Sequence, residues 1–409
     1  MTTLMARNIT LYRWSRFLRS LIFWQAIWFL YFQDVLSAAQ AILLYAVYDV
    51  AVTLLEVPSG YMSDRLGRRP TLILSAIAAF LGAACLWIGD SFAMFAAGQI
   101  LIGAGGAFAS GTEESLLYES LAATDRADEI EPQEVVAWRY SFTALALSAV
   151  TGGAMALFDA RLPFLAGAIA MIALFAVTWR MSEPPRRSDA PDGGELLRLR
   201  HLAGHFRDPV LLWIFALSVL MYGFSHLPFV FGQPFILEAL SAMGLAPSAP
   251  VVSGAVTAVM MGLSVTVSLF AVGLRNRIGL SGILLGAFAL QIAISGVMAL
   301  TDSALVLAVL MLRMIPDALS RPFILGRIQP LLSDDSRATW LSLKSFVGRL
   351  GFASALAIGA VSTTDVGQMP YADIQSILTV ATLIGLAALA CLALTARRAG
   401  VSKNSSASR

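Results

Sequence analysis

Residues 60–69 read Gly-Tyr-Met-Ser-Asp-Arg-Leu-Gly-Arg-Arg, and this stretch decides the fold. A long apolar run ends just before it, and another begins at Thr71. One aspartate and three arginines therefore lie in a connection too short for anything but a tight turn between two apolar helices. Gly60 and Gly67 permit close backbone approach or a positive φ where the chain reverses. The stretch predicts two membrane helices joined by a charged turn.

The composition places the rest of the chain in the same environment. Hydrophobic residues make up 58% of the 409 residues and charged residues 13%, whereas soluble domains have roughly half and a quarter. Apolar runs of about 20 residues, enough to cross a bilayer, recur along the chain. Cys85 and Cys391 lie inside such runs, which indicates small buried side chains. We expect a membrane protein without cofactor, metal or nucleic-acid partner.

Twelve segments are long and apolar enough to cross the membrane. We place them near 17–36, 38–58, 70–89, 92–120, 134–157, 161–180, 209–232, 251–274, 280–300, 303–322, 337–361 and 374–396. The sequence therefore predicts an all-α membrane protein with two six-helix bundles. The N-terminal bundle covers residues 1–180, a cytoplasmic linker covers 181–208, and the C-terminal bundle covers 209–409.

Lysine and arginine are distributed unevenly between the two sides of this topology. The side that holds both termini carries 23 of the 28 basic residues, and the opposite side carries only Arg161. Basic residues are retained on the cytoplasmic side of membrane proteins. We therefore predict a multi-pass protein of the bacterial inner membrane with both termini in the cytoplasm.

The charged turn resembles the signature that the major facilitator superfamily carries between spans two and three. The matching residues are Gly60, Asp64, Arg65, Gly67, Arg68 and Arg69. The equivalent turn of the second half reads Asn-Arg-Ile-Gly over residues 276–279, which fits a duplicated transporter. The resemblance implies two pseudo-symmetric bundles that open a central cavity to one side of the membrane at a time.

For the motif itself, the resemblance implies a gate rather than a binding site. We expect Asp64 to accept hydrogen bonds from the N-terminus of span eleven, after residues 333–336, and the arginines to clamp the halves together. Two features of proton-driven drug exporters are missing. Gln99 stands where they carry an arginine, and the Gly-Pro before Gly152 and Gly153 is absent. Both absences weaken the interpretation as a drug antiporter.

Four carboxylates are candidates for proton coupling, because a charge at membrane depth costs about 2.5–3.5 kcal/mol. Asp49, in the middle of span two, either binds a proton or pairs with a neighbouring helix. Glu113 and Glu114 point about 100° apart on span four. One is expected to bond toward Arg139 and the other to face the cavity, in a structural network or in coupling. Asp34 ends span one, as a helix cap or as a substrate or proton site.

The second half contains the main candidates for substrate binding. Arg313 in span ten and Arg349 in span eleven are deep basic groups, and Lys344 is shallower. Asp317, four residues after Arg313, can neutralise part of its charge, and Pro316 between them predicts a kink. The basic groups predict recognition of an anionic substrate group, or pairing with acidic groups of the first half.

Two further side chains are candidates for the substrate site. His226, near the periplasmic end of span seven, titrates near neutrality and can relay protons. Trp28 in span one either lines an aromatic cavity wall or packs against other helices.

These features predict a secondary transporter that moves a small organic solute by alternating access, with proton-coupled efflux preferred. Proton-coupled uptake of an anionic metabolite is the alternative. A non-transporting membrane sensor is an alternative of another class, although the longest polar stretch is too short for a sizeable soluble domain. The chain shows no catalytic cluster, so we expect no enzyme. The expected partners are substrate, protons and the lipid bilayer, with the protein acting as a monomer.

Overall fold

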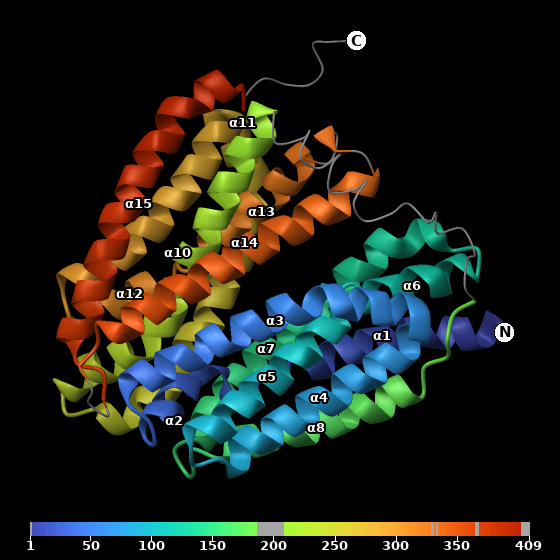
Figure 1. The fold of residues 1–409 in the computed structure, drawn as a ribbon, viewed down its shortest axis with the longest axis horizontal. Coiled ribbons are helices and arrows are strands. Elements are labelled where there is room, and N and C mark those ends of the chain that lie inside the picture. Colours follow the sequence, from blue (N-terminus) through green and yellow to red (C-terminus); the bar gives the residue numbers. More distant parts are fainter. Residues whose placement is uncertain (1, 186–207, 329–330, 333, 365–367, 402–409) are drawn as a thin grey trace. The chain divides into compact units, whose positions relative to one another are not determined.

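A computed structural model describes residues 2–185, 208–328, 331–332, 334–364 and 368–401. Regular secondary structure in these ranges is helical (Figure 1). Most of the predicted linker lies outside the described residues.

In the first half, the helices follow the predicted apolar segments and are separated by short breaks. They are α1 (Thr2–Arg19), η1 (Phe23–Ala26), α2 (Trp28–Gln33), α3 (Ala38–Leu66), α4 (Arg68–Ile88), α5 (Phe92–Ala109), α6 (Thr112–Ala122), η2 (Ala127–Glu129), α7 (Ile130–Met155) and α8 (Leu162–Trp179). The second half continues with α10 (Pro209–Ser241), η3 (Ala246–Ser248), α11 (Ala249–Leu300), α12 (Val306–Leu310), α13 (Ile315–Ile328), α14 (Asp334–Val361) and α15 (Tyr371–Ala399).

Eight helices of the described chain are long and apolar enough to cross a membrane. One of them, α11, covers the predicted spans at 251–274 and 280–300, because its backbone turns at Gly279. The three other predicted spans, 17–36, 134–157 and 303–322, fall on shorter or more polar helices. The architecture is that of an all-α membrane protein and is consistent with twelve spans.

The two charged turns share one backbone conformation. Gly67 has φ 110° and ψ 162°, and Gly279 has φ 77° and ψ 168°. Both values of φ lie where L side chains are strained, so glycine is needed at each turn. The predicted repeat between the halves is therefore present in local geometry as well as in sequence.

The predicted ten-residue turn at 60–69 is wrong in length. Helix α3 continues through Pro58 to Leu66, and α4 begins at Arg68, so Gly67 alone separates them. Hydropathy indicates where the apolar side chains of a helix end, whereas the backbone hydrogen bonds of α3 continue past that point.

Contacts divide the chain into two compact units. The N-terminal unit contains α1 to α8 together with Pro247–Ala258 and Leu356–Gln368. The C-terminal unit contains α10, α12, α13, α15 and the remaining parts of α11 and α14.

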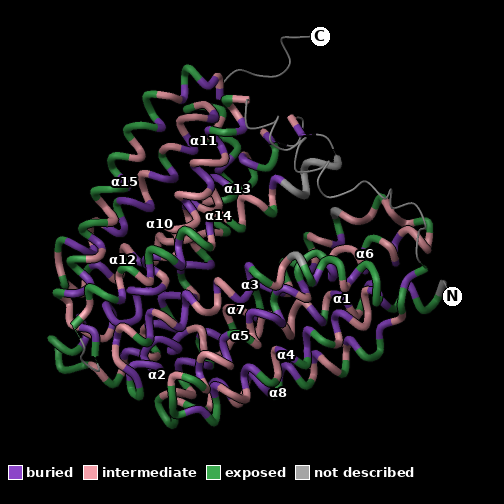
Figure 2. The backbone as a smooth tube through the Cα atoms, viewed as in Figure 1, coloured by how far each residue is buried: buried purple, intermediate pink, exposed green. Residues whose placement is uncertain are grey.

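Small residues allow close helix packing within the N-terminal unit, where α4 packs against α5 and α8. A Cβ atom at Gly82 would lie 2.8 Å from the backbone nitrogen of Ile102, and one at Gly105 would lie 3.0 Å from the Ser75 carbonyl oxygen. Glycine at such positions lets membrane helices approach closely. Buried residues therefore run along the inner faces of these helices (Figure 2).

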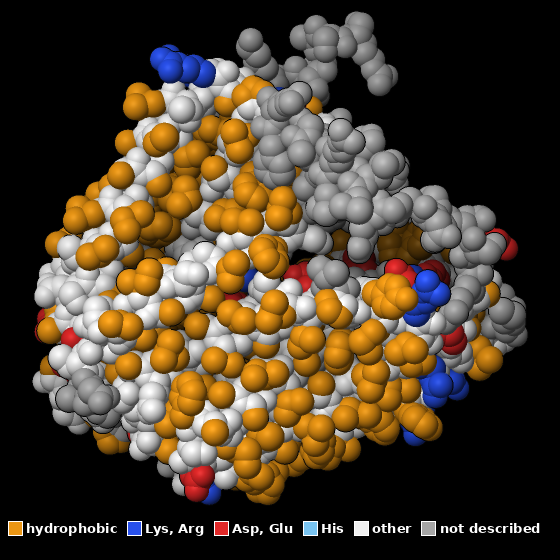
Figure 3. Space-filling view, in the orientation of Figure 1, with side chains coloured by type: hydrophobic (Ala, Val, Ile, Leu, Met, Phe, Trp, Pro, Cys, Tyr) orange, Lys and Arg blue, Asp and Glu red, His pale blue; other side chains and the backbone are white. Residues whose placement is uncertain are grey.

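Exposed apolar side chains cover the outside of the helices. On α15, Leu383 is 62% exposed and Leu394 is 78% exposed. Hydrophobic side chains spread over much of the visible face in Figure 3. Such a surface is stable in contact with lipid chains and not in water.

Candidate functional site

The fourth predicted span of each half is broken along its length. In the N-terminal unit, α5 ends at Ala109 and α6 begins at Thr112, with Gly111 in the left-handed region at φ 72°. In the C-terminal unit, α12 ends at Leu310 and α13 begins at Ile315. Substrate and ion sites of transporters are typically built at such discontinuous helices. The predicted kink near Pro316 corresponds to the second break.

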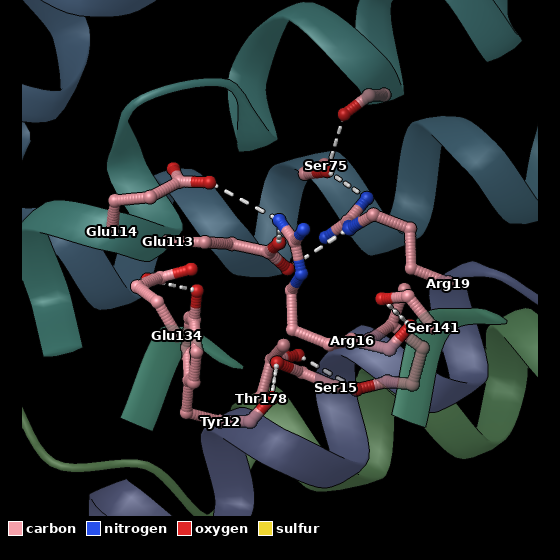
Figure 4. A network of polar contacts seen from close by, with 12 residues as sticks. Tyr12, Ser15, Arg16, Arg19, Ser75, Glu113, Glu114, Glu134, Ser141 and Thr178 are labelled. Atoms are coloured by element: carbon pink, nitrogen blue, oxygen red, sulfur yellow. Dashed lines mark hydrogen bonds and ion pairs between the residues drawn. The ribbon is translucent and has the colours of Figure 1, made fainter. Parts of the chain in front are cut away.

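A charge network, defined by Arg16, Arg19, Glu113 and Glu114, lies beside the first break (Figure 4). Glu113 receives Arg19 Nε at 2.9 Å and Arg16 Nη1 at 3.4 Å. The same Arg16 nitrogen lies 3.1 Å from Oε1 of Glu114. Two helices, α1 and α6, are therefore joined by three ionic contacts.

Hydrogen bonds extend the charge network to three more helices. Arg19 Nη1 donates to Ser75 Oγ at 2.9 Å, and Ser75 Oγ donates to the Gly105 carbonyl oxygen. Tyr12 Oη donates to Glu134 Oε1 at 2.7 Å (Figure 4). The first helix is thus connected to α4, α5, α6 and α7 by polar contacts near its C-terminal end.

The expectation that a glutamate of span four bonds toward Arg139 is wrong. Arg139 is exposed on α7, and both glutamates contact arginines of α1 instead. The N-terminal arginines were assigned to the aqueous side on charge alone. Because α1 is one continuous helix ending at Arg19, it carries Arg16 and Arg19 into contact with α6.

The motif residues lie around the turn at Gly67. Arg68 contacts Asp64 Oδ1 at 2.7 Å, Ser63 Oγ at 2.7 Å and Glu119 Oε1 at 2.9 Å. The role of Asp64 at span eleven concerns the other unit and stays a prediction. The sequence did not point to Glu119, whose place on α6 becomes clear only in the fold.

Glu183, at the start of the polar stretch after α8, binds the other side of this turn. Its two carboxylate oxygens accept the backbone N–H groups of Arg68 and Arg69, each at 2.7 Å. A carboxylate at a helix N-terminus satisfies unpaired donors and complements the helix dipole. A Cβ at Gly67 would lie 2.6 Å from Glu183 Oε1, so the turn needs glycine for space as well as for φ.

The other motif residues have simpler surroundings. Arg69 donates to the Trp179 carbonyl oxygen at 2.9 Å and lies 5.2 Å over the Trp179 ring. Arg65 lies 5.4 Å over the Tyr61 ring. Gly60 has open space around its Cα inside α3.

The remaining N-terminal candidates differ in burial. Asp49 is 4% exposed on α3, and its carbonyl oxygen accepts the Thr53 hydroxyl at 2.7 Å. Asp34 is exposed directly after α2. Trp28 is 4% exposed, with its ring 5.6 Å from that of Phe32. The position of Trp28 favours helix packing over the alternative of a cavity wall.

A cavity of about 330 Å³ opens in the C-terminal unit between α10, α13 and α14. Its hydroxyl groups come from Ser218, Tyr222, Ser225, Ser320 and Ser345, and its charged groups from Asp317, Arg321 and Lys344. This volume is near the lower end of the range of small-molecule sites, about 300–1,000 Å³. We call it the C-terminal cavity.

Asp317 is paired with Arg321, at 2.8 Å between Oδ2 and Nη2. The predicted neutralisation of Arg313 by Asp317 assumed one continuous helix. Residues 311–314 are not helical, so the four-residue spacing does not place these two side chains as it would on a helix. The i,i+4 pair within α13 is present, and the neutralisation of Arg313 by Asp317 stays a prediction.

Two arginines lie against aromatic rings beside the cavity. Arg313 lies 4.9 Å over the ring of Phe229, with Nε 3.3 Å from the sulfur of Met260. Arg349 lies 5.7 Å over the ring of Tyr222, and its Nη1 donates to the Tyr222 hydroxyl at 3.4 Å. Such cation–π contacts hold a guanidinium in place without neutralising its charge.

His226 lies midway along α10, and its predicted place near the periplasmic end of the membrane stays a prediction. The helix continues past Pro228 and Pro234 to Ser241, which moves its centre toward His226. Nδ1 of His226 lies 2.7 Å from the Tyr222 carbonyl oxygen, and its ring lies 4.2 Å from that of Tyr222. The side chain is thus fixed against a residue that lines the cavity.

These observations define a multi-pass helical membrane protein with broken spans and a polar site in the bundle, which is the construction of a secondary transporter. The sequence model of the Major Facilitator Superfamily matches residues 15–324. The chain therefore belongs to the major facilitator superfamily, whose members are transporters rather than enzymes. No curated protein matches the chain significantly in sequence.

Solved structures similar to this chain are transporters of several solutes. A variant of the nucleoside transporter NupG is 13% identical, with a TM-score of 0.76 over 95% of this chain and 99% of that chain. The peptide transporter POT in complex with sulfate is 14% identical, with a TM-score of 0.72 over 98% and 96%. A D-xylose–proton symporter is 15% identical, with a TM-score of 0.66 over 94% and 97%. These identities establish a shared fold.

Proposed function

We propose that this protein is a proton-coupled transporter for a small organic solute that carries an anionic group. It works by alternating access, as a monomer in the bacterial inner membrane, with both termini in the cytoplasm and with no nucleic-acid partner. The observation that carries the proposal is the excess of basic groups in and beside the C-terminal cavity.

Charge in the cavity supports an anionic substrate. Arg321 and Asp317 offset each other, and Lys344 adds a positive charge. No second acidic side chain lines the cavity in the described part of the chain. A carboxylate or phosphate group would gain charge-assisted hydrogen bonds here.

Hydroxyl groups are the second feature of the C-terminal cavity that can recognise a substrate. Serines from α10, α13 and α14 line the same cavity as Lys344. Ligand sites combine one charged anchor with a few polar groups that fix orientation. Such a set suits a compact polar acid better than a large apolar cation, the substrate type of many drug exporters.

An anionic substrate changes the preferred direction of transport. The inside-negative membrane potential opposes the influx of an anion, and each charge moved across 100 mV costs about 2.3 kcal/mol. Protons that travel with the anion remove this cost. We therefore rank uptake by proton symport above the efflux that the sequence favoured, and the D-xylose–proton symporter is a precedent for symport on this fold.

We also propose that the motif around Gly67 acts as the cytoplasmic gate. Asp64 holds Arg68 in the turn, so it sets the geometry of the helix end that must separate when the cavity opens inward. Asp64→Asn should abolish transport while the yield of folded protein stays near that of the wild type. Normal transport rates in this variant would refute the gate.

The experiment that tests the function uses purified protein in liposomes loaded with a pH-sensitive dye. Monocarboxylates, dicarboxylates, sugar phosphates, neutral sugars and cationic amphiphiles are screened for proton movement. Co-flow of protons with an anion, lost in Lys344→Ala and retained in Arg126→Ala, is the expected result. Counter-flow of protons with a cationic amphiphile would establish an exporter instead. Absence of proton movement with every solute would refute proton coupling.

A further inference from the structure

Arg16 is shared between two neighbouring glutamates that have different surroundings. We infer that Glu114 is the carboxylate that takes up the coupled proton and that Arg16 responds to its charge. This inference rests on the proposed proton coupling, and it selects one residue among the four carboxylate candidates.

The surroundings of Glu113 favour a carboxylate that stays ionised. Its side chain is 2% exposed, and it receives one guanidinium nitrogen from Arg19 and one from Arg16. A buried carboxylate with two such partners is expensive to separate from them. Glu113 has neither the solvent access nor the freedom that repeated proton exchange requires.

Glu114 has the opposite properties. Its side chain is 46% exposed, against 2% for Glu113. Oε1 contacts Arg16, whereas Oε2 is itself buried and has no hydrogen-bond partner within the described chain. An unsatisfied buried oxygen is costly, and the cost is greater for a charged group. Of the two carboxylates, Glu114 is the accessible and incompletely bonded one.

The charges around Glu114 come from three helices. From α1 come Arg16 and Arg19, with the Tyr12 hydroxyl; from α6 comes Glu113; and from α7 comes Glu134, which accepts the Tyr12 hydroxyl. With all groups ionised, three carboxylates face two guanidinium groups. One proton restores neutrality, which predicts a stoichiometry of one proton for this site.

Protonation of Glu114 has a direct structural consequence. The neutral carboxyl loses its ionic attraction for Arg16, which then keeps Glu113 as its carboxylate partner in the charge network. Arg16 also lies 5.1 Å over the ring of Trp138 on α7, and its carbonyl oxygen accepts the Ser141 hydroxyl at 3.5 Å. Proton uptake therefore loosens α6 from α1 next to the break at Gly111 while α1 stays attached to α7.

Infrared difference spectroscopy of the purified protein tests protonation without any substrate. Lowering the pH should produce a carboxylic acid band that is missing in Glu114→Gln. The band should remain in Asp49→Asn. Loss of the band in Asp49→Asn, with its retention in Glu114→Gln, would overturn the inference.

Transport gives the second readout. In Glu114→Gln, substrate exchange at equal pH should persist, its pH dependence should flatten, and accumulation driven by a pH gradient should be lost. Glu129→Gln, an exposed carboxylate, is the matched control and should behave as wild type. If the wild type shows no coupled protons, the proposed function fails. If the wild type and Glu114→Gln couple protons equally, this inference alone fails.

Discussion

The charge network of the N-terminal unit and the C-terminal cavity use the same residue types in different ways. In the network, arginine and glutamate side chains contact one another directly. Glu113, which contacts both arginines, is 1% exposed as a residue. In the cavity, one acidic side chain is accompanied by Arg321 and Lys344, and hydroxyl and apolar side chains line the rest. The network is close to charge balance, and the cavity carries excess positive charge.

This difference indicates a division of tasks between the two units. A balanced network changes its bonding when a single proton arrives, which suits energy coupling. A cavity with surplus positive charge and free volume is completed by an anionic solute, which suits binding. Substitutions in the two units should therefore have separable effects on stability, coupling and binding.

Glu113→Ala should cause the greatest loss of stability. Removing one partner of a buried ion pair leaves uncompensated charge and costs about 3–5 kcal/mol. Arg16 and Arg19 would both lose a carboxylate on α6. Thermal unfolding in detergent, followed by tryptophan fluorescence, measures the effect. Combining Glu113→Leu with Arg19→Met should recover part of the loss, and a melting temperature equal to that of the wild type in Glu113→Ala would contradict the account.

Lys344→Ala should weaken substrate binding without unfolding the protein. A hydrogen bond to a charged group contributes about 1.5–3 kcal/mol, which corresponds to roughly a tenfold to hundredfold rise in Kd. Lys344→Arg keeps the charge and should retain most of the affinity. The apparent KM for anion uptake in liposomes is the measurement. An unchanged KM in Lys344→Ala would place the anion elsewhere.

Gly67→Ala should destabilise the turn by about 1–3 kcal/mol, because alanine is strained at this φ. The added Cβ would also lie only 2.6 Å from Oε1 of Glu183, which is a steric clash. Gly60→Ala is the matched control, since that glycine is helical with open space around it. The control should be neutral or slightly stabilising. Equal melting temperatures for the two variants would refute the argument from backbone geometry.

Arg126→Ala should have the smallest effect. Arg126 and Glu129 form an exposed pair at 2.7 Å, and hydrogen bonds from Arg126 and Gln133 lower the pKa of Glu129 to about 2. Because this pKa is lowered, any stability that the pair contributes is present at neutral pH and is lost as the pH falls from about 4 toward 2. Melting temperatures at neutral pH should match those of the wild type, because exposed pairs contribute little.

Hydropathy and glycine positions predicted the architecture well. The apolar segments locate the helices because lipid contact demands apolar side chains along each span. The repeated turn was predictable because Gly67 and Gly279 occupy equivalent positions, and both turns need a positive φ that favours glycine. Where local chemistry decides, the sequence alone was sufficient.

Tertiary contacts were less predictable. Arg16 and Arg19 looked like cytoplasmic anchors, yet they contact Glu113 because α1 packs against α6. Glu183 lies 115 residues from Arg68 in sequence, and no local pattern connects them. The length of α10 was underestimated because the helix continues through two prolines.

The most direct test of the division of tasks is calorimetric titration with the anion identified in liposomes. Binding heats measured in buffers of different ionisation enthalpy give the number of protons taken up with each substrate molecule. We predict proton uptake on binding in the wild type, binding without proton uptake in Glu114→Gln, and little binding in Lys344→Ala. Undiminished proton uptake in Glu114→Gln, or wild-type affinity in Lys344→Ala, would contradict the account.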